Sequence, residues 1–430
     1  MSTDVAPADL VVETKVTRAP ISSAQRFGAA GVLALLGLVT IWRFGIHGHH
    51  HEKAKLQLGA TGAAHVPHFS LPAAPVAWGV GIAIIALGAL WLAVPRRRLF
   101  GIVMGLGLFL FVFALVCWLA SASSYAFVDV VGLLFSSIQL AVPLILGALA
   151  GVMCERSAVI NVAIEGQMLA GAWAAALFGT LIGTTAGLLS GALAGALMGA
   201  ILAVFAIRYL VNQVVLGVVL NVFAAGLTGF AYDAFMQPHA ESLNQPPLMD
   251  PKKIPLLGDI PVIGPLLFDN IILVYITYVL IVVVDVWLFR TRWGLRTRAV
   301  GEHPKAADTV GIRVLAMRYR NVIIGGAIAG LGGSYFIFQV GQFQKNITSG
   351  QGFIALAALI FGRWSPRGAV GAALLFGFAS ALQVTLSINA PSIPSNVVAM
   401  LPYLATILAV AGLVGKVRAP AADGEPYVKS

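Results

Sequence analysis

The chain has 430 residues, of which 59% are hydrophobic and only 10% are charged, and its mean hydropathy is +0.91. Soluble domains carry about 25% charged residues, so this composition excludes an ordinary soluble protein and predicts a surface that mostly faces lipid. The net charge of +10 then indicates a positive-inside bias, and without a basic, aromatic platform it does not indicate nucleic-acid binding.

Apolar segments long enough to cross the lipid bilayer, roughly 20 residues each, recur along the chain. The first 26 residues are polar and lack the apolar core of a signal peptide, so we expect the first span to be retained as an anchor. The predicted fold class is all-α, a polytopic membrane protein with about 12 transmembrane helices, in a range of roughly 10–12. The predicted spans begin near Phe27, Ala74, Leu99, Val130, Val162, Leu181, Val214, Ile271, Val322, Gly352, Ala369 and Val397.

The distribution of arginine and lysine predicts the orientation. With the N-terminus in the cytoplasm, most basic residues fall on the inner side, and both termini are expected to be cytoplasmic. The outer side then carries a His-rich loop from Gly48 to Leu71 and a Pro-rich loop from Asp233 to Asn270, and the inner side carries a basic stretch from Arg290 to Arg320.

Four regions follow from this pattern. Residues 1–26 are expected to form a cytoplasmic tail, and residues 27–125 an N-terminal extension with extra transmembrane helices and the His-rich loop. Residues 126–415 are expected to form the membrane-spanning core, and residues 416–430 a second cytoplasmic tail. The histidines of the loop have no fixed ligand spacing, so we predict no metal site and no cofactor.

The basic stretch contains the strongest local signal. Gly294 and Gly301 can break the inner end of a long span, and Pro304 favours the first turn of a new helix. Gly311 can end that helix, so we predict a short helix of about two turns along the cytoplasmic face. A motor subunit could push on such a helix, but a basic loop anchored by lipid headgroups fits the same residues.

Polar residues within apolar spans are candidates for a transport pathway. Asn161 and Glu165 are four residues apart and are expected to share a helix face at the inner membrane edge. Glu165 either belongs to the pathway or caps backbone amides of a neighbouring helix. The amides of Gln139, Asn221 and Gln339 either contact substrate or hold helices together.

Two further expectations concern the second half of the sequence. About eleven residues separate Gly352 from Arg363, too few to cross about 30 Å of hydrocarbon, so this segment is expected to be a broken or re-entrant helix. Asp285 is expected to pair with Arg290 or Arg292.

Four motifs, in the same order, resemble those of ABC permeases of the branched-chain amino acid, simple sugar and nucleoside type. Residues 155–166 resemble the ER(S/A)GVVNIGLEG signature of the nucleoside and simple-sugar branch, and residues 212–228 resemble NQVVSGLALN followed by GLT. Residues 294–312 resemble GL..RAVGENP.AAD..GI, and residues 352–364 resemble GFIALAA.IFG.W. The resemblance covers about two-thirds of the chain and implies the fold of a type II ABC importer permease.

The resemblance also implies a function. The chain would be the membrane-spanning subunit of an ATP-driven importer for nucleosides or simple sugars in the bacterial inner membrane. Its implied partners are ABC ATPase subunits, a second and different permease subunit, and an extracytoplasmic substrate-binding protein. His303 stands where the family usually has asparagine. The positions implied to couple to the ATPase are Gly301, Glu302, Pro304, Ala307 and Gly311.

Other functions remain open. Related permeases for branched-chain amino acids or pentoses share these motifs. An ion-coupled secondary transporter would need membrane-embedded acids, and Glu165 is the only good candidate. A membrane enzyme is disfavoured because no paired catalytic constellation is found, and the chain has no ATP-binding loop of the G-x-x-x-x-G-K-[ST] type.

Overall fold

The computed structural model describes residues 23–48, 53–57, 68–122, 128–389, 400 and 418–429. Contacts divide the chain into two compact units. One comprises Met1–Lys53 and Leu71–Trp118, and the other comprises Ala54–Ser70 and Leu119–Ser430.

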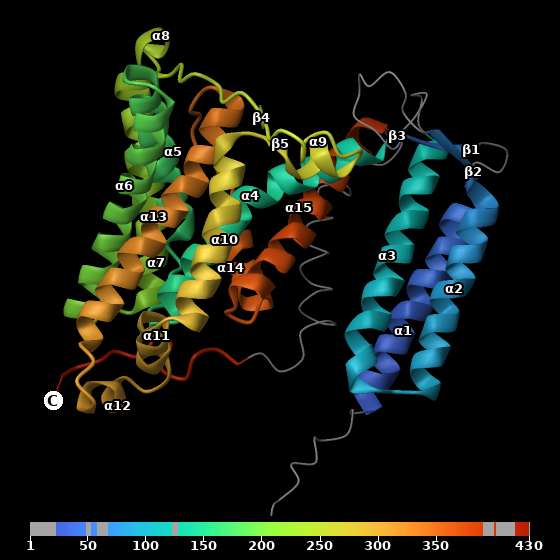
Figure 1. Cartoon of the computed structure of the whole chain (residues 1–430), viewed down its shortest axis with the longest axis horizontal. Helices are drawn as coiled ribbons and strands as arrows, with labels where there is room; N and C mark the ends of the chain where they lie inside the picture. Colours follow the sequence, from blue (N-terminus) through green and yellow to red (C-terminus); the bar gives the residue numbers. More distant parts are fainter. Residues whose placement is uncertain are drawn as a thin grey trace, which may run out of the picture. The chain divides into compact units, whose positions relative to one another are not determined.

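The first unit is built from three long apolar helices (Figure 1). They are α1 (Ser23–Val39), which continues as the π-helical η1 (Thr40–Ile46), α2 (Ala73–Ala93) and α3 (Arg97–Ala122). Aromatic pairs hold them together: the rings of Phe44 and Trp118 stack with centroids 5.4 Å apart, and those of Trp91 and Phe100 lie 5.3 Å apart. This packing buries Phe44, Trp91 and Trp118 and leaves other large apolar side chains exposed, as expected of helices surrounded by lipid.

The second unit is a helical bundle with a few short strands. Its long helices are α4 (Val130–Glu155), α5 (Ile164–Leu181), α6 (Thr184–Ala203), α7 (Gln213–Ala231), α10 (Ile272–Arg290), α13 (Val314–Val340) and α15 (Pro366–Asn389). Its shorter helices are α8 (Ala240–Leu243), α9 (Ile263–Leu267), α11 (Arg292–Glu302), α12 (Pro304–Thr309) and α14 (Gln351–Phe361), with π-helical turns η2 (Val204–Arg208) and η3 (Tyr232–Met236).

The strands are short. β1 (Lys53–Gln57), β2 (His68–Pro72) and β3 (Val128–Asp129) form a sheet in the order β2-β1-β3, with β1 parallel to β3. β4 (Lys252–Lys253) pairs antiparallel with β5 (Asp269–Asn270).

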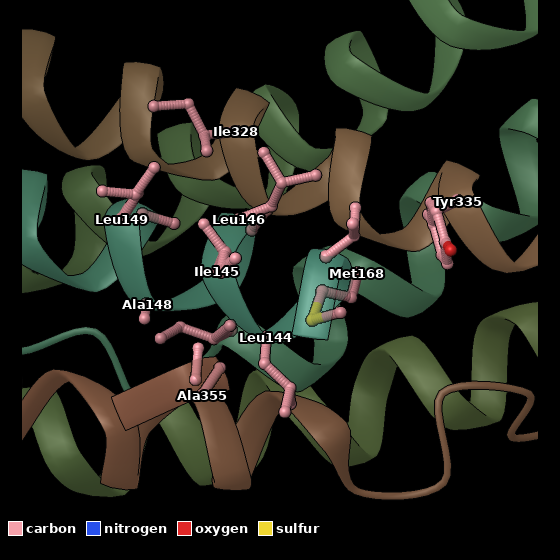
Figure 2. Close-up of a cluster of buried hydrophobic side chains, with 14 of the residues drawn as sticks. Leu144, Ile145, Leu146, Ala148, Leu149, Met168, Ile328, Tyr335 and Ala355 are labelled. Carbon is pink, nitrogen blue, oxygen red and sulfur yellow. The ribbon is translucent and has the colours of Figure 1, made fainter. Parts of the chain in front are cut away.

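Helix α13 lies at the centre of the second unit because glycines let its backbone touch its neighbours. A Cβ atom on Gly330 would lie 2.1 Å from the carbonyl oxygen of Gly191 in α6, and one on Gly333 would lie 1.8 Å from that of Met168 in α5. Association of helices in lipid depends on such close packing, since lipid offers no hydrophobic drive. Figure 2 shows the aliphatic side chains of α4 that fill the space between α13 and α14.

Nine helices in the described ranges are long and apolar enough to cross a membrane, and each corresponds to one of the predicted spans. The segment predicted from Val162 forms α5, whose 18 residues begin at Ile164. The predicted short segment forms α14, which has 11 residues and is too short to span a bilayer. The span predicted near Val397 lies largely outside the described residues. The chain is therefore an all-α, multi-pass membrane protein.

The two ends of the second unit carry different elements (Figure 1). Helices α11 and α12 lie at one end, and α8, β4 and β5 lie at the other. The basic stretch and the Pro-rich loop are thus separated by the length of the bundle, the arrangement expected if they face opposite sides of a membrane.

Candidate functional site

A cluster of amide and phenol side chains joins α4, β5 and α13. Tyr335 donates a hydrogen bond to Oε1 of Gln139, and Nε2 of Gln339 donates to the same oxygen at 3.1 Å and to the Tyr335 hydroxyl at 2.9 Å. Nε2 of Gln139 donates to Oδ1 of Asn270 at 2.7 Å. Two of the predicted pathway residues, Gln139 and Gln339, therefore meet although 200 positions separate them. We call Gln139, Asn270, Tyr335 and Gln339 the amide–tyrosine cluster.

The cluster connects buried and exposed parts of the bundle. Tyr335 is buried, Gln139 is half-buried and Gln339 is exposed. The nearby Tyr278 interacts electrostatically with Tyr335, and its own buried hydroxyl has no hydrogen-bond partner among the described residues. A buried hydroxyl normally has a partner, so this one retains an unused hydrogen-bonding capacity. Sequence reasoning missed Tyr335, although it is four residues before Gln339 and therefore on the same helix face.

Glu165 has a structural role that the sequence left as one of two alternatives. Its Oε1 accepts hydrogen bonds from the Thr348 hydroxyl at 2.6 Å and from the Gly350 amide at 2.8 Å, and its Oε2 accepts from the Gly352 amide at 2.6 Å. The carboxylate thereby caps the N-terminus of α14, where free amides and the helix dipole favour a negative charge.

Asn221 acts as a clamp between α5 and α7. Its Oδ1 accepts from the Gly166 amide at 2.8 Å, and its Nδ2 donates to the Val162 carbonyl at 2.9 Å. Asn221 therefore provides hydrogen-bond partners for backbone groups at the start of α5, as Glu165 provides them for backbone amides at the start of α14. The sequence offered substrate contact and helix attachment as alternatives for this residue, and the observed bonds are those of attachment.

The prediction that Asn161 and Glu165 share a helix face is wrong. Helix α5 begins at Ile164, so Asn161 lies in the irregular segment before it. The Asn161 side chain is fully buried and exchanges hydrogen bonds with Gln167, at 3.0 Å and 3.3 Å. The pairing of the two amides replaces the helical contact that the spacing suggested.

Four of the five predicted coupling positions lie in α11 and α12, and Gly311 follows them; we name α11 and α12 the coupling module after that prediction. Pro304 occupies the first turn of α12, Ala307 is buried, and Gly311, with φ of 81°, follows the end of the helix. The expected short helix is therefore present. The break from α10 differs from the prediction: it falls at Thr291, whose hydroxyl accepts from the Gly294 amide at 3.2 Å, and Gly294 lies inside α11.

Gly301 connects the coupling module to the end of α4. A Cβ atom at this position would lie 2.3 Å from the carbonyl oxygen of Arg156, so only glycine fits. Arg156 also donates from Nε to the Trp364 carbonyl at 2.7 Å, and burial lowers the pKa of its guanidinium. Trp364 in turn donates from its indole to the Glu155 carboxylate. The motif at residues 155–166 and the motif at residues 352–364 are thus in contact at this end of the bundle.

Two other predictions concern charged or metal-binding side chains. Asp285 pairs with Arg367, at 2.8 Å, and not with Arg290 or Arg292 as expected, because the start of α15 lies beside α10. The described ranges contain no group of three or more histidine, cysteine or acidic side chains that could hold a metal ion. His49, His50, His51 and His65 lie outside the described residues.

Sequence comparisons support a transport role. Residues 133–411 match the model of the family described as branched-chain amino acid transport system / permease component. The guanosine ABC transporter permease protein NupQ of Bacillus subtilis is 42% identical over 302 residues, covering 67% of this chain and 94% of the relative. The nucleoside ABC transporter permease protein NupC of Lactococcus lactis is 39% identical, with the same coverage.

A third relative is more distant. The putative glucose ABC transporter permease protein TsgC13 of Haloferax volcanii is 32% identical and covers 59% of this chain and 77% of the relative. No solved structure matches. The family match covers more than half of the chain and agrees with the helical bundle and the order of the motifs. The protein belongs to the branched-chain amino acid transport system / permease component family and is a membrane-spanning transport subunit.

Proposed function

We propose that this permease carries nucleosides across the bacterial inner membrane and that the amide–tyrosine cluster contacts them. The observation that carries the proposal is the group of uncharged donors and acceptors on α4 and α13, beside the unsatisfied hydroxyl of Tyr278. Amides and phenols match the hydroxyls and base edges of a nucleoside, because each can both donate and accept. The names of two relatives, guanosine permease and nucleoside permease, support the same substrate class.

Branched-chain amino acids fit the cluster less well. A zwitterion carries a carboxylate and an ammonium group, and moving either from water into a membrane domain is costly unless an opposite charge receives it. Gln139, Asn270, Tyr335 and Gln339 carry no charge. A pentose shares the hydroxyl chemistry of a nucleoside but lacks the base, so it remains the second candidate.

The coupling module is proposed to receive an ABC ATPase. Helix α12 is short and lies at the end of the bundle, and α11, which precedes it, contacts the residue after α4 through Gly301. Movement of an ATPase against α11 and α12 would therefore displace the end of a central helix. We propose that the ATPase end faces the cytoplasm, that a second, homologous permease completes the membrane domain, and that an extracytoplasmic binding protein delivers the substrate at the opposite end.

Transport assays with substrate competition test this proposal. The chain, the second permease, the ATPase and the binding protein would be reconstituted in liposomes, and uptake of a radiolabelled nucleoside would be measured with excess unlabelled nucleoside, ribose or leucine. Competition by nucleosides alone is expected. Inhibition by leucine would contradict the substrate class, and inhibition by ribose would favour the pentose alternative.

A variant tests the cluster itself. Gln139→Leu removes the amide that joins the other three side chains, and the KM for uptake is expected to rise about tenfold, equivalent to ~1.4 kcal/mol. Gln383→Leu, a half-buried amide on α15 outside the cluster, is the matched control and should leave KM unchanged. Equal effects of both variants would show that general destabilisation, not substrate contact, is being measured.

Ion-coupled transport is the remaining alternative. It predicts that uptake stops when ion gradients and membrane potential are collapsed with ATP present. The proposed ATP-driven importer keeps its activity under that condition and loses it when the ATPase cannot hydrolyse ATP.

A further inference from the structure

Residues 418–429 run across the coupling module at the end of the bundle, and we call them the strap (Figure 1). The Ala422 amide donates to the Gly301 carbonyl at 3.0 Å, and the Ala421 amide donates to the Glu302 carboxylate at 3.2 Å. Within the strap, the backbone amide of Asp423 donates to the Pro420 carbonyl and that of Glu425 donates to the Ala422 carbonyl, which forms a turn. The strap therefore covers the end of α11 and uses backbone groups that α11 leaves free.

Tyr427 anchors the far end of the strap. Only 6% of its surface is exposed, and it packs in a cluster with Val300 of α11, Ala307 of α12 and the first turn of α13. Its hydroxyl interacts with the Asp308 carboxylate of α12. A six-residue helix has little stability by itself, so α12 depends on tertiary contacts, and the Tyr427 ring provides one of them.

The strap also gives a buried charge in α13 a hydrogen-bond partner, although Nε and Nη2 of this arginine, Arg318, have none among the described residues. Arg318 is 1% exposed, and its Nη1 donates to the Glu425 carbonyl at 2.9 Å. Its guanidinium lies 5.9 Å from the Tyr427 ring and interacts electrostatically with Asp423. A buried guanidinium is costly without such partners. Docking of the strap is therefore favoured by Arg318, and the position of this part of α13 depends on the strap.

The remaining contacts reach α4 and the segment after it. The Asp423 carboxyl faces that of Glu155, the last residue of α4. Gly424 has φ of 79°, and a Cβ atom there would lie 2.6 Å from the Ile160 side chain. The turn of the strap thus packs against the segment that follows α4. Gly301 contacts the same segment at the Arg156 carbonyl.

We propose that the strap is a positioning element of energy coupling, which makes α11 and α12 move as one body with the inner ends of α4 and α13. This inference rests on the proposed function, because it assumes an ATPase that pushes on the coupling module. Without the strap, α12 is attached to α13 by a short loop containing Gly311, and displacement of α12 would be absorbed there. With the strap docked, the displacement reaches two central helices.

The test compares Tyr427→Ala with Val428→Ala in the reconstituted permease–ATPase complex. Val428 is the neighbouring residue and 65% exposed, so its truncation leaves the buried contacts intact. Substrate molecules transported per ATP hydrolysed would be measured for each. We expect this ratio to fall about tenfold in Tyr427→Ala, to remain at the wild-type value in Val428→Ala, and to be restored largely by Tyr427→Phe, which keeps the ring. An unchanged ratio in Tyr427→Ala overturns the inference.

A second variant keeps the inference testable if Tyr427→Ala does not fold. Gly424→Ala places a methyl group against Ile160 and requires an unfavourable φ, but it removes no core side chain. It should lower the same ratio while assembly with the ATPase, measured by co-purification, is retained. Normal coupling in an assembled Gly424→Ala complex whose strap is released also overturns the inference.

Hydrogen exchange of the full chain separates failure of this inference from failure of the proposed function. The amides of Ala421 and Ala422 are expected to be protected in the wild type and to exchange rapidly in Tyr427→Ala. Unprotected amides in the wild type would overturn the strap alone. Protected amides in a complex that fails to transport nucleosides would contradict the proposed substrate and leave the strap in place.

Discussion

Replacing Glu165 tests the structural role of its carboxylate. The carboxylate accepts three hydrogen bonds, from the Thr348 hydroxyl and the amides of Gly350 and Gly352, at 2.6–2.8 Å. In Glu165→Gln, one oxygen can still accept two of these bonds, but the new NH2 group faces the Gly352 amide. An amide left without an acceptor costs about 1–3 kcal/mol. In Glu165→Ala all three bonds are lost, and we expect a loss of about 3–5 kcal/mol.

The temperature of unfolding of the purified protein gives the measurement. A loss of 1 kcal/mol lowers Tm by roughly 2–4 °C in proteins of about 150–250 residues, so both variants should unfold several degrees below the wild type, Ala more than Gln. Scans would follow tryptophan fluorescence at one fixed rate, because membrane proteins often unfold irreversibly. Glu241→Gln, an exposed glutamate on α8, is the control.

Two results would refute this reasoning. If Glu165→Ala unfolds at the wild-type temperature, the three hydrogen bonds do not stabilise α14. If Glu165→Gln keeps the wild-type Tm but loses uptake, the charge serves transport, as an ion-coupled mechanism would require.

Three further predictions use the same assays. Gly301→Ala should uncouple ATP hydrolysis from uptake, because its methyl group would lie 2.3 Å from the Arg156 carbonyl and must displace the coupling module; full coupling would contradict the proposed contact. Burial raises the pKa of Asp423 to about 7, above its unfolded value, and the ionisable groups that face it are Glu155, Arg318 and Cys154. Docking of the strap is therefore strongest at acidic pH and weakens as pH rises through about 7. Asp423→Asn should reduce this dependence, measured by limited proteolysis of the strap from pH 5 to 8. Arg367→Ala should lower the free energy of unfolding by less than about 1 kcal/mol, and Tm by only a few degrees, because the arginine side chain of its pair with Asp285 is 73% exposed.

Local patterns in the sequence were sufficient to predict most of the long helices, the short helix α12 and the family. The apolar segments predicted the spans, and Pro304 and Gly311 predicted the short helix between them, because helix formation and hydropathy depend on residues within about 20 positions. The order of four motifs indicated the permease family before any coordinates were considered.

The partners of the polar residues depended on the tertiary structure. Gln139 and Gln339 were candidates from the sequence, but their meeting, like the capping of α14 by Glu165, follows from the register in which glycine-lined helices pack. The strap left no signal in hydropathy, since residues 418–429 are a polar segment with no helical or strand period. A segment of this kind becomes ordered only because a buried arginine and the free backbone groups of α11 need partners, and neither need is visible until the helices are assembled.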